Sequence, residues 1–490
     1  MQLRGLDRPQ TMPVTEKSMT PSKCGAPPLS TDSAVAKPAA RAGLILAALA
    51  AGFVMASLDV TVVNVAGADI QQYLGASLGE LTWIIDGYVL TFASLLMLGG
   101  ALANRLGARR LYISGMVVFF VASLACALSP SAGVLIAARL VQGAGAALFM
   151  PSSLSLLVFA FPEKRLRTKM LGLWSAIVAT AAGLGPTIGG LLVGLFGWQS
   201  IFLINLPVGI LGIVLTMRYI APAAGREIRI AVPGHGLWIA ALAALSFALI
   251  EGPRRGWVSG PVLTAYIVLI IAAAVLIGYE RRVVDLVMPW ELFRRKAFTG
   301  ANSVGFLFNL ALYGSMFMLA LYLQHARGAT PFEAGLQLLP MTIWFPLGNL
   351  VYSRISAKFS NGAMLTLFLV IAAVASLTMI TVSSSMPYWL LALAVGIANI
   401  GAGIISPGMT AALVDSAGTE HANVAGSVLN ANRQIGTLVG IAIMSVILSS
   451  ANDWNSAAAV SFLVIGVAYA TAAVGAWLLI QRPEHMLTSR

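Results

Sequence analysis

Three ionisable residues lie inside long apolar stretches of the chain: Asp59, Arg139 and Arg433. A charge at the centre of a membrane costs roughly 2.5–3.5 kcal/mol on insertion scales, so such residues usually face a protein interior and often mark a transport path. Burial favours the protonated form of a carboxylate, which makes Asp59 a candidate to load and release a proton near neutral pH. The alternative interpretation is a structural aspartate that caps or hydrogen-bonds a neighbouring helix.

The two arginines also have two interpretations each. Arg139 lies in LIAARLVQGAGAALFMP, where Gln142 and Gly143 follow at i+3 and i+4 and share its helix face. It is either a charge partner that responds to protonation of an acid or half of a structural interhelical pair. Arg433 lies in SVLNANRQIGTLVG, three residues after Asn430, and either lines a cavity or pairs structurally.

Two further polar residues of the apolar stretches, Asn64 and Asp86, are candidates for the same cavity or for coupling. The second half of the chain offers a single comparable acid, Asp415, near the end of an apolar run. Exporters of dications would be expected to carry several embedded carboxylates as counter-charges. The sequence therefore favours neutral, monocationic or amphipathic compounds over dications as cargo.

The elements that position these residues are predicted to be membrane helices. Of the 490 residues, 58% are hydrophobic and 10% are charged, whereas soluble domains average about 25% charged. Apolar runs of the ~20 residues that span a bilayer recur along the chain, without the alternation of a transmembrane barrel. We expect about fourteen spans, near residues 43–66, 83–103, 111–128, 134–160, 171–195, 201–220, 237–252, 261–279, 299–323, 334–353, 363–382, 388–411, 423–448 and 457–480.

The basic residues are distributed asymmetrically over this layout. With the N-terminus inside, 25 of the 30 Lys and Arg fall on the inner side and three on the outer side. The positive-inside rule then predicts a multi-pass protein of the cytoplasmic membrane with both termini cytoplasmic. The net charge of +12 therefore needs no nucleic acid as partner, and no basic arm, zinc spacing or recognition module supports one.

The longest inner connections follow spans six and eight and set spans seven and eight apart as an inserted pair. We therefore expect an all-α fold of two six-helix bundles plus two inserted helices. Many secondary transporters consist of such repeats, with the substrate site between them. The expected parts are a disordered cytoplasmic tail (1–42), an N-terminal bundle (43–220), the inserted helices (237–279), a C-terminal bundle (299–480) and a second cytoplasmic tail (481–490).

A glycine-rich segment, AAGLGPTIGGLLVG, occupies residues 181–194. Its Gly185, Gly189 and Gly190 allow another helix to approach closely. Pro186 removes a backbone donor and favours a kink. The segment is either a packing face or a helix that bends during a transport cycle.

Several kinds of chemistry have no signal in the sequence. There is no phosphate-binding loop for ATP, no HExxH and no paired-cysteine zinc spacing. Cys24 and Cys126 lie in a polar and an apolar segment, and we interpret both as free thiols. We expect no enzyme activity, no metal and no cofactor.

Five motifs along the chain resemble one family. They are LDVTVVNVA (58–66), GALANRLGARR (100–110), LIAARLVQGAGAA (135–147), GPTIGG (185–190) and SVLNANRQIGTLVGIAI (427–443). Together they resemble the major facilitator superfamily, and within it the fourteen-helix drug:proton antiporters, over roughly residues 43–480. The resemblance implies that Asp59 and Arg139 couple proton movement to transport and that residues 185–190 form the antiporter helix motif.

The loop motif of the superfamily is matched with changes. Its positions here are Gly100, Asn104, Arg105, Gly107 and Arg109. The family usually has an aspartate in place of Asn104, which helps hold one conformation, and a basic residue in place of Ala108. Asn104 lacks the carboxylate of that aspartate, so the sequence does not fix how strongly this loop holds one conformation in this chain.

The function we expect is proton-coupled export of small organic compounds (drugs, toxins or secondary metabolites) by alternating access. The partners are the cargo, protons and the lipid bilayer. The alternative is a proton-coupled or facilitative carrier of one metabolite, including an importer. A membrane sensor is disfavoured because the chain has embedded charges and no signalling domain. The sequence leaves open whether the protein is monomeric or works with accessory export proteins.

Overall fold

The computed structural model describes residues 38–222, 231–282, 290–356, 358–418 and 422–482, which form helices and short connections without a strand. Fourteen helical segments in this part of the chain are long and apolar enough to cross a membrane. The predicted all-α membrane fold and number of spans are therefore confirmed. The predicted 1–42 and 481–490 tails lie mostly outside the described residues, and the first helix begins at Pro38.

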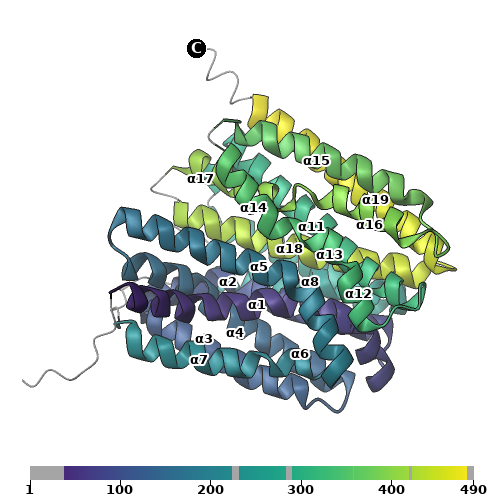
Figure 1. The fold of residues 1–490 in the computed structure, drawn as a ribbon, viewed down its shortest axis with the longest axis horizontal. Coiled ribbons are helices and arrows are strands. Elements are labelled where there is room, and N and C mark those ends of the chain that lie inside the picture. The colour runs from purple at the N-terminus through teal and green to yellow at the C-terminus, as the bar shows by residue number, and fades with distance from the viewer. Residues whose placement is uncertain (1–37, 223–230, 283–289, 357, 419–421, 483–490) are drawn as a thin grey trace, which may run out of the picture.

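The helices before residue 222 pack together as one bundle, shown in purple to teal in Figure 1. Ser77 and Glu80 form a reciprocal capping box that starts the second helix. Gly107 has a φ of 94°, which lets the chain turn between the second and third helices. The helices are α1 (Pro38–Leu74), α2 (Leu78–Leu106), α3 (Ala108–Ala127), α4 (Ala132–Ala160), α5 (Lys164–Phe196), α6 (Ser200–Leu203) and α7 (Asn205–Tyr219).

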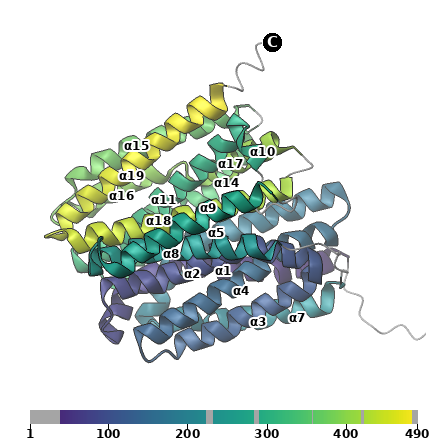
Figure 2. The same cartoon turned by 180° about the vertical axis from the view of Figure 1, so that it is seen from behind.

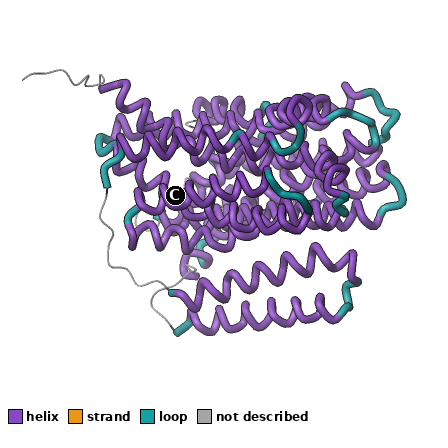
Figure 3. Tube along the Cα trace, turned by 90° about the horizontal axis from the view of Figure 1, so that it is seen from below, coloured by secondary structure: helices purple, strands orange, loops and turns teal. Residues whose placement is uncertain are grey.

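The inserted pair consists of α8 (Val232–Arg255) and α9 (Gly260–Glu280). Figure 3 shows a two-helix layer along one side of the main body, and Figure 2 shows α8 and α9 crossing it. The α8 helix packs against α2 and α18, one helix of each bundle. Its Glu251 accepts hydrogen bonds from Trp83 Nε1 of α2 (3.1 Å) and from Arg255 Nε (2.5 Å). The pair is thus anchored where the two bundles meet.

The remaining helices form the second bundle, green to yellow in Figure 1. They are α10 (Trp290–Phe293), α11 (Lys296–His325), α12 (Pro331–Gln337), α13 (Leu339–Thr342), α14 (Trp344–Ile355), α15 (Asn361–Thr378), α16 (Tyr388–Asn399), α17 (Ala402–Ala417), α18 (Ala422–Ser450) and α19 (Trp454–Ala476), with the short turns η1 (Met379–Thr381) and η2 (Trp477–Gln481).

Three predicted spans are divided in the structure. The span expected at 201–220 is divided into α6 and α7 at Ile204. The span expected at 334–353 is divided into α12, α13 and α14. Pro340 and Pro346 lie within it and remove two backbone donors, which explains the interruptions. The span expected at 388–411 is divided into α16 and α17 at Ile400 and Gly401. Several helices also extend beyond their predicted ends, as α1 does on both sides.

The two bundles are joined at one end of their helices, opposite the connections that are rich in Lys and Arg. The positive-inside rule places those connections inside, so the joined helix ends lie outside. Among the described residues, three hydrogen bonds cross between the bundles. They are Gln324 Nε2 to Val65 O (3.0 Å), Thr187 Oγ1 to Gly335 O (3.2 Å) and Thr82 Oγ1 with Ser445 Oγ (2.7 Å). All three lie in the outer halves of their helices, so the structure has its outer side closed.

Candidate functional site: a buried ion pair in the first bundle

Asp59 and Arg139 form an ion pair between α1 and α4. Arg139 Nη1 donates to Asp59 Oδ2 and also to Gln142 Oε1 (2.7 Å). The two charged side chains are 1% and 0% exposed. The structure therefore brings together the aspartate and the arginine that were predicted from the sequence, and it buries both side chains.

Gln142 completes the contact and connects it to α3. Its Nε2 donates to Asp59 Oδ1 (3.0 Å) and to Ser123 Oγ (2.9 Å). The i to i+3 spacing puts Arg139 and Gln142 on one face of α4, as the sequence indicated. We call Asp59, Arg139, Gln142 and Ser123 the central network. Because both Asp59 oxygens accept hydrogen bonds, the carboxylate is satisfied although buried.

The second helix holds the guanidinium from the other side. Arg139 Nε donates to the backbone oxygen of Ile84 (2.9 Å), and the guanidinium carbon lies 4.4 Å from the centre of the Tyr88 ring. A cation over an aromatic face in a water-free site is stabilised by the ring's quadrupole. Arg139 Nη2 and the Tyr88 hydroxyl have no hydrogen-bond partner among the described residues. These two groups therefore have unused hydrogen-bonding capacity within the site.

Sequence reasoning did not select Tyr88, Ser123 or Cys126 as parts of this site. Cys126 is a free, buried thiol, and its Sγ lies 3.7 Å from Gln142 Oε1 as a donor. Ser123 also accepts from Asn205 Nδ2 of α7 (3.4 Å). The only sequence feature that could have indicated Ser123 and Cys126 is a polar side chain within an apolar helix. Because serine and cysteine are common in membrane helices, this feature is a weak indication of a site.

The other predicted site residues lie apart from the central network. Asn64 is buried and donates to Val60 O of its own helix (2.8 Å). Asp86 is fully buried on α2 without a hydrogen-bond partner for either oxygen. On α18, Asn430 and Arg433 are half-buried, and Arg433 Nε has no partner among the described residues. None of these four makes a hydrogen bond to the central network in the described part of the chain.

The loop motif lies at the inner turn between α2 and α3. Asn104 and Arg105 are exposed, and Gly107 supplies the turn. Arg109 Nη2 donates to Met217 O at the end of α7 (2.8 Å), so this arginine joins two helices of the same bundle. Gly100 is half-buried on α2, where a Cβ would lie 4.0 Å from Pro151 Cβ.

The antiporter helix motif packs α5 between α1 and α12. A Cβ at Gly189 would lie 2.8 Å from Val62 Cγ1, and one at Gly185 would lie 2.9 Å from Thr61 Cβ. A Cβ at Gly190 would collide with the backbone oxygen of Pro331. On the facing helix, a Cβ at Gly335 would lie 2.5 Å from Pro186 O. Gly185 and Gly189 therefore let α5 pack closely against α1 within the first bundle, and Gly190 and Gly335 allow backbone contact between the two bundles at the closed outer side.

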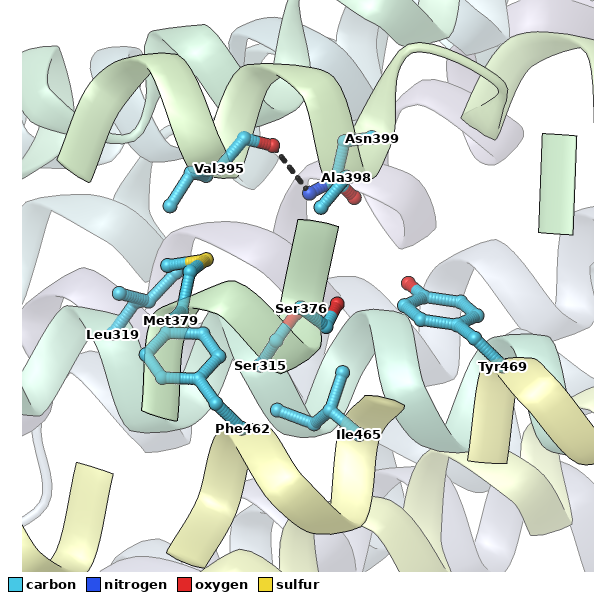
Figure 4. A pocket seen from close by; sticks show the side chains of 10 residues that line it. All are labelled: Ser315, Leu319, Ser376, Met379, Val395, Ala398, Asn399, Phe462, Ile465 and Tyr469. Carbon is cyan, nitrogen blue, oxygen red and sulfur yellow. Dashed lines mark hydrogen bonds between the residues drawn. The ribbon is translucent and has the colours of Figure 1, made fainter. Parts of the chain in front are cut away.

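A small cavity lies within the second bundle, shown in Figure 4. Ser376, Asn399 and Tyr469 give it polar atoms among apolar walls, and Asn399 Nδ2 donates to Val395 O (2.9 Å). Its volume is about 10 Å³, far below the several hundred Å³ of a drug-sized ligand site. This cavity is too small to hold an organic cargo.

A membrane fold of two helical bundles is typical of a secondary transporter, and here the first bundle holds a buried ion pair. The chain belongs to the Major Facilitator Superfamily, whose sequence-family model matches residues 49–440 and 301–489. It is 70% identical to a methylenomycin A resistance protein of Streptomyces coelicolor over 443 residues, which are 90% of this chain and 93% of that protein.

Two more distant relatives extend the comparison. A methylenomycin A resistance protein of Bacillus subtilis is 46% identical over 89% of this chain and 94% of its own length. A tetracenomycin C resistance and export protein of Streptomyces glaucescens is 32% identical over 83% of this chain and 76% of its own length. The expected family and the expected class, a multi-pass exporter of small molecules in the cytoplasmic membrane, are thereby confirmed.

Proposed function

We propose that this protein exports methylenomycin A, or a compound close to it, in exchange for protons. The substrate follows from the two relatives named for resistance to methylenomycin A, one of which is 70% identical over nearly the whole chain. Proton coupling is supported by one observation above all, the solvent-free ion pair of Asp59 and Arg139. The protein moves its cargo unchanged.

In this mechanism, protonation of Asp59 removes the negative charge that holds Arg139. The guanidinium keeps its contacts with Ile84 O and the Tyr88 ring, but its link to α1 is lost. Since that link joins α1 to α4, each protonation state favours a different arrangement of these helices. A proton taken up from outside and released inside would thus drive the alternation between open sides.

The glycine motif on α5 supports the same cycle. It permits the tight outer contact between α5 and α12, which has to form and break as the outer side closes and opens. A carrier that imports a metabolite is the competing function. The relatives named for resistance and export favour the outward direction.

The test uses inverted membrane vesicles, where export appears as uptake. An imposed proton gradient should drive accumulation of methylenomycin A, and a protonophore should abolish it. Asp59→Asn should lose this accumulation, whereas Asp69→Asn, a half-buried carboxylate farther along α1, should keep it. Uptake that is indifferent to the protonophore would refute proton coupling, and no uptake would favour a different cargo or an importer.

A further inference from the structure

We propose that Asp86 is a second proton-binding site, and that it must hold a proton for the outer seam between α2 and α18 to close. The outer seam denotes the contact of these two helices around Thr82 and Ser445. The inference rests on the proposed function, because it adds a proton-linked step to the same transport cycle.

Asp86 lies on the face of α2 that forms the outer seam. Thr82 Oγ1 and Ser445 Oγ are hydrogen-bonded across the seam at 2.7 Å. Asp86 follows Thr82 by four residues, one helical turn inward, and so shares its face. The neighbouring Gly87 and Tyr88 face α4 instead, where Leu140 and Gly143 contact them. The Asp86 carboxyl is therefore directed away from the central network and towards the second bundle.

The closed seam offers Asp86 no compensation for a negative charge. The residue is 0% exposed, and neither carboxyl oxygen has a hydrogen-bond partner among the described residues. One turn inward of Ser445, α18 presents the buried apolar residues Ile441 and Ala442. An ionised carboxylate without partner or water is strongly disfavoured, and the group takes up a proton instead. Closure of the seam thus selects protonated Asp86.

The charged groups on the neighbouring helices are engaged elsewhere. Arg139 is held by Asp59 and Gln142, and Glu251 is paired with Arg255. Arg433 precedes Ile441, which lies one turn inward of Ser445, by eight residues, or about 12 Å along a helix. The titratable and charged residues on the helices packed against α2 are Arg41, Asp59, Asp69 and Tyr73 on α1, Arg109, Arg110, Tyr112 and Cys126 on α3, Arg139 on α4, His235, Glu251, Arg254 and Arg255 on α8, and Arg433 on α18.

The pH outside should control whether the outer seam is closed or open. When the outer seam separates, water reaches Asp86 and the carboxyl exchanges its proton with the outside. Acid outside then keeps Asp86 neutral and favours closure, whereas alkaline conditions ionise it and favour the open seam. Asp86 would act separately from Asp59, whose proton changes the contact between α1 and α4.

The test measures the seam directly in the purified full chain in lipid nanodiscs without cargo. Spin labels are placed at Gly79→Cys on α2, where no atom lies within 4 Å of a new Cβ, and at the exposed Ser450→Cys on α18. Cys24 is replaced by serine, and Cys126 is buried. Distance distributions between the labels are recorded over a pH series.

We expect the short-distance population to fall as pH rises in the otherwise unchanged protein. Asp86→Asn, which resembles the protonated acid, should keep the short distance at every pH. Asp86→Glu should retain a pH response with a shifted midpoint, which excludes a merely structural effect. Asp69→Asn, at a half-buried carboxylate on α1, should keep the response.

A pH response that survives in Asp86→Asn, or that is missing from the unchanged protein, would overturn the proposal. The result is independent of the vesicle assay. If the seam responds through Asp86 while gradient-driven uptake survives Asp59→Asn, the coupling role of Asp59 fails and this inference stands. If uptake depends on Asp59 but the pH response of the label distance is the same with and without Asp86→Asn, the coupling role of Asp59 stands and this inference fails.

Discussion

Asp59 and Arg139 are 80 residues apart in the chain, yet they bind each other between α1 and α4 with neither side chain reaching solvent. Each charge is buried at a cost that the other offsets, so the pair is stable only while both are charged. A proton on the Asp59 carboxylate removes its charge and so weakens the pair. The contact therefore links the stability of one arrangement of α1 and α4 to the protonation of this carboxylate.

The first prediction concerns the cost of breaking this pair. Arg139→Met leaves Asp59 buried without its counter-charge, which costs about 3–5 kcal/mol in buried pairs. Asp59→Asn with Arg139→Met should be clearly less destabilised than Arg139→Met alone, because no charge is then left unpaired. Thermal unfolding in detergent compares the variants. Equal losses for the single and the double variant would show that the two side chains do not interact energetically.

The second prediction concerns the α5 contact with the second bundle. Gly190→Ala places a Cβ against the backbone oxygen of Pro331 and should keep the outer side from closing, with a large loss of transport. Gly172→Ala on the same helix meets nothing within 4 Å and should leave transport unchanged. Vesicle uptake, normalised to the amount of folded protein, measures both. Equal activity of the two variants would refute the role of close packing.

The third prediction concerns the inserted helices. Trp83→Phe keeps the aromatic ring but removes the indole donor to Glu251, which lies 3.1 Å away. The loss of one hydrogen bond to a charged group should cost about 1.5–3 kcal/mol of stability at most, less where water replaces it. Trp389 is 64% exposed, so Trp389→Phe is the matched control. An unchanged melting temperature in Trp83→Phe would show that this bond does not anchor the inserted pair.

The fourth prediction concerns the charge of the cargo. Asp59 is neutralised by Arg139, and Arg433 adds an embedded cation without an ion-pair partner among the described residues. Asp86 is buried without a hydrogen-bond partner among the described residues, so a dication would find one unpaired embedded carboxylate there and not two. In competition experiments, neutral and monocationic compounds should inhibit methylenomycin A uptake more strongly than dications of similar size. Stronger inhibition by dications would contradict this expectation.

The fold and the ion pair were predictable from sequence for a physical reason. Apolar runs long enough to cross the bilayer have few alternatives to a helix, and a charge within such a run needs a partner. Asp59 and Arg139 were the clearest such charges in the first half, and the structure pairs them.

Other features depend on three-dimensional register, which local sequence does not encode. Nothing in the residues near Asp86 shows that its side of α2 faces α18 at a closed seam. The contact of the Tyr88 ring with Arg139 also requires the relative rotation of α2 and α4. The divisions of the 334–353 span depend on how its prolines pack, since proline within α4 and α5 leaves those helices continuous.

The central claim is that Asp59 couples proton movement to export, and exchange in proteoliposomes tests it most directly. Labelled methylenomycin A is followed in two modes, accumulation driven by a proton gradient and one-for-one exchange without a gradient. The account predicts that Asp59→Asn loses the first and retains the second, because cargo binding and helix movement survive while the proton site is gone. Gradient-driven accumulation by Asp59→Asn at the level of the unchanged protein would contradict it.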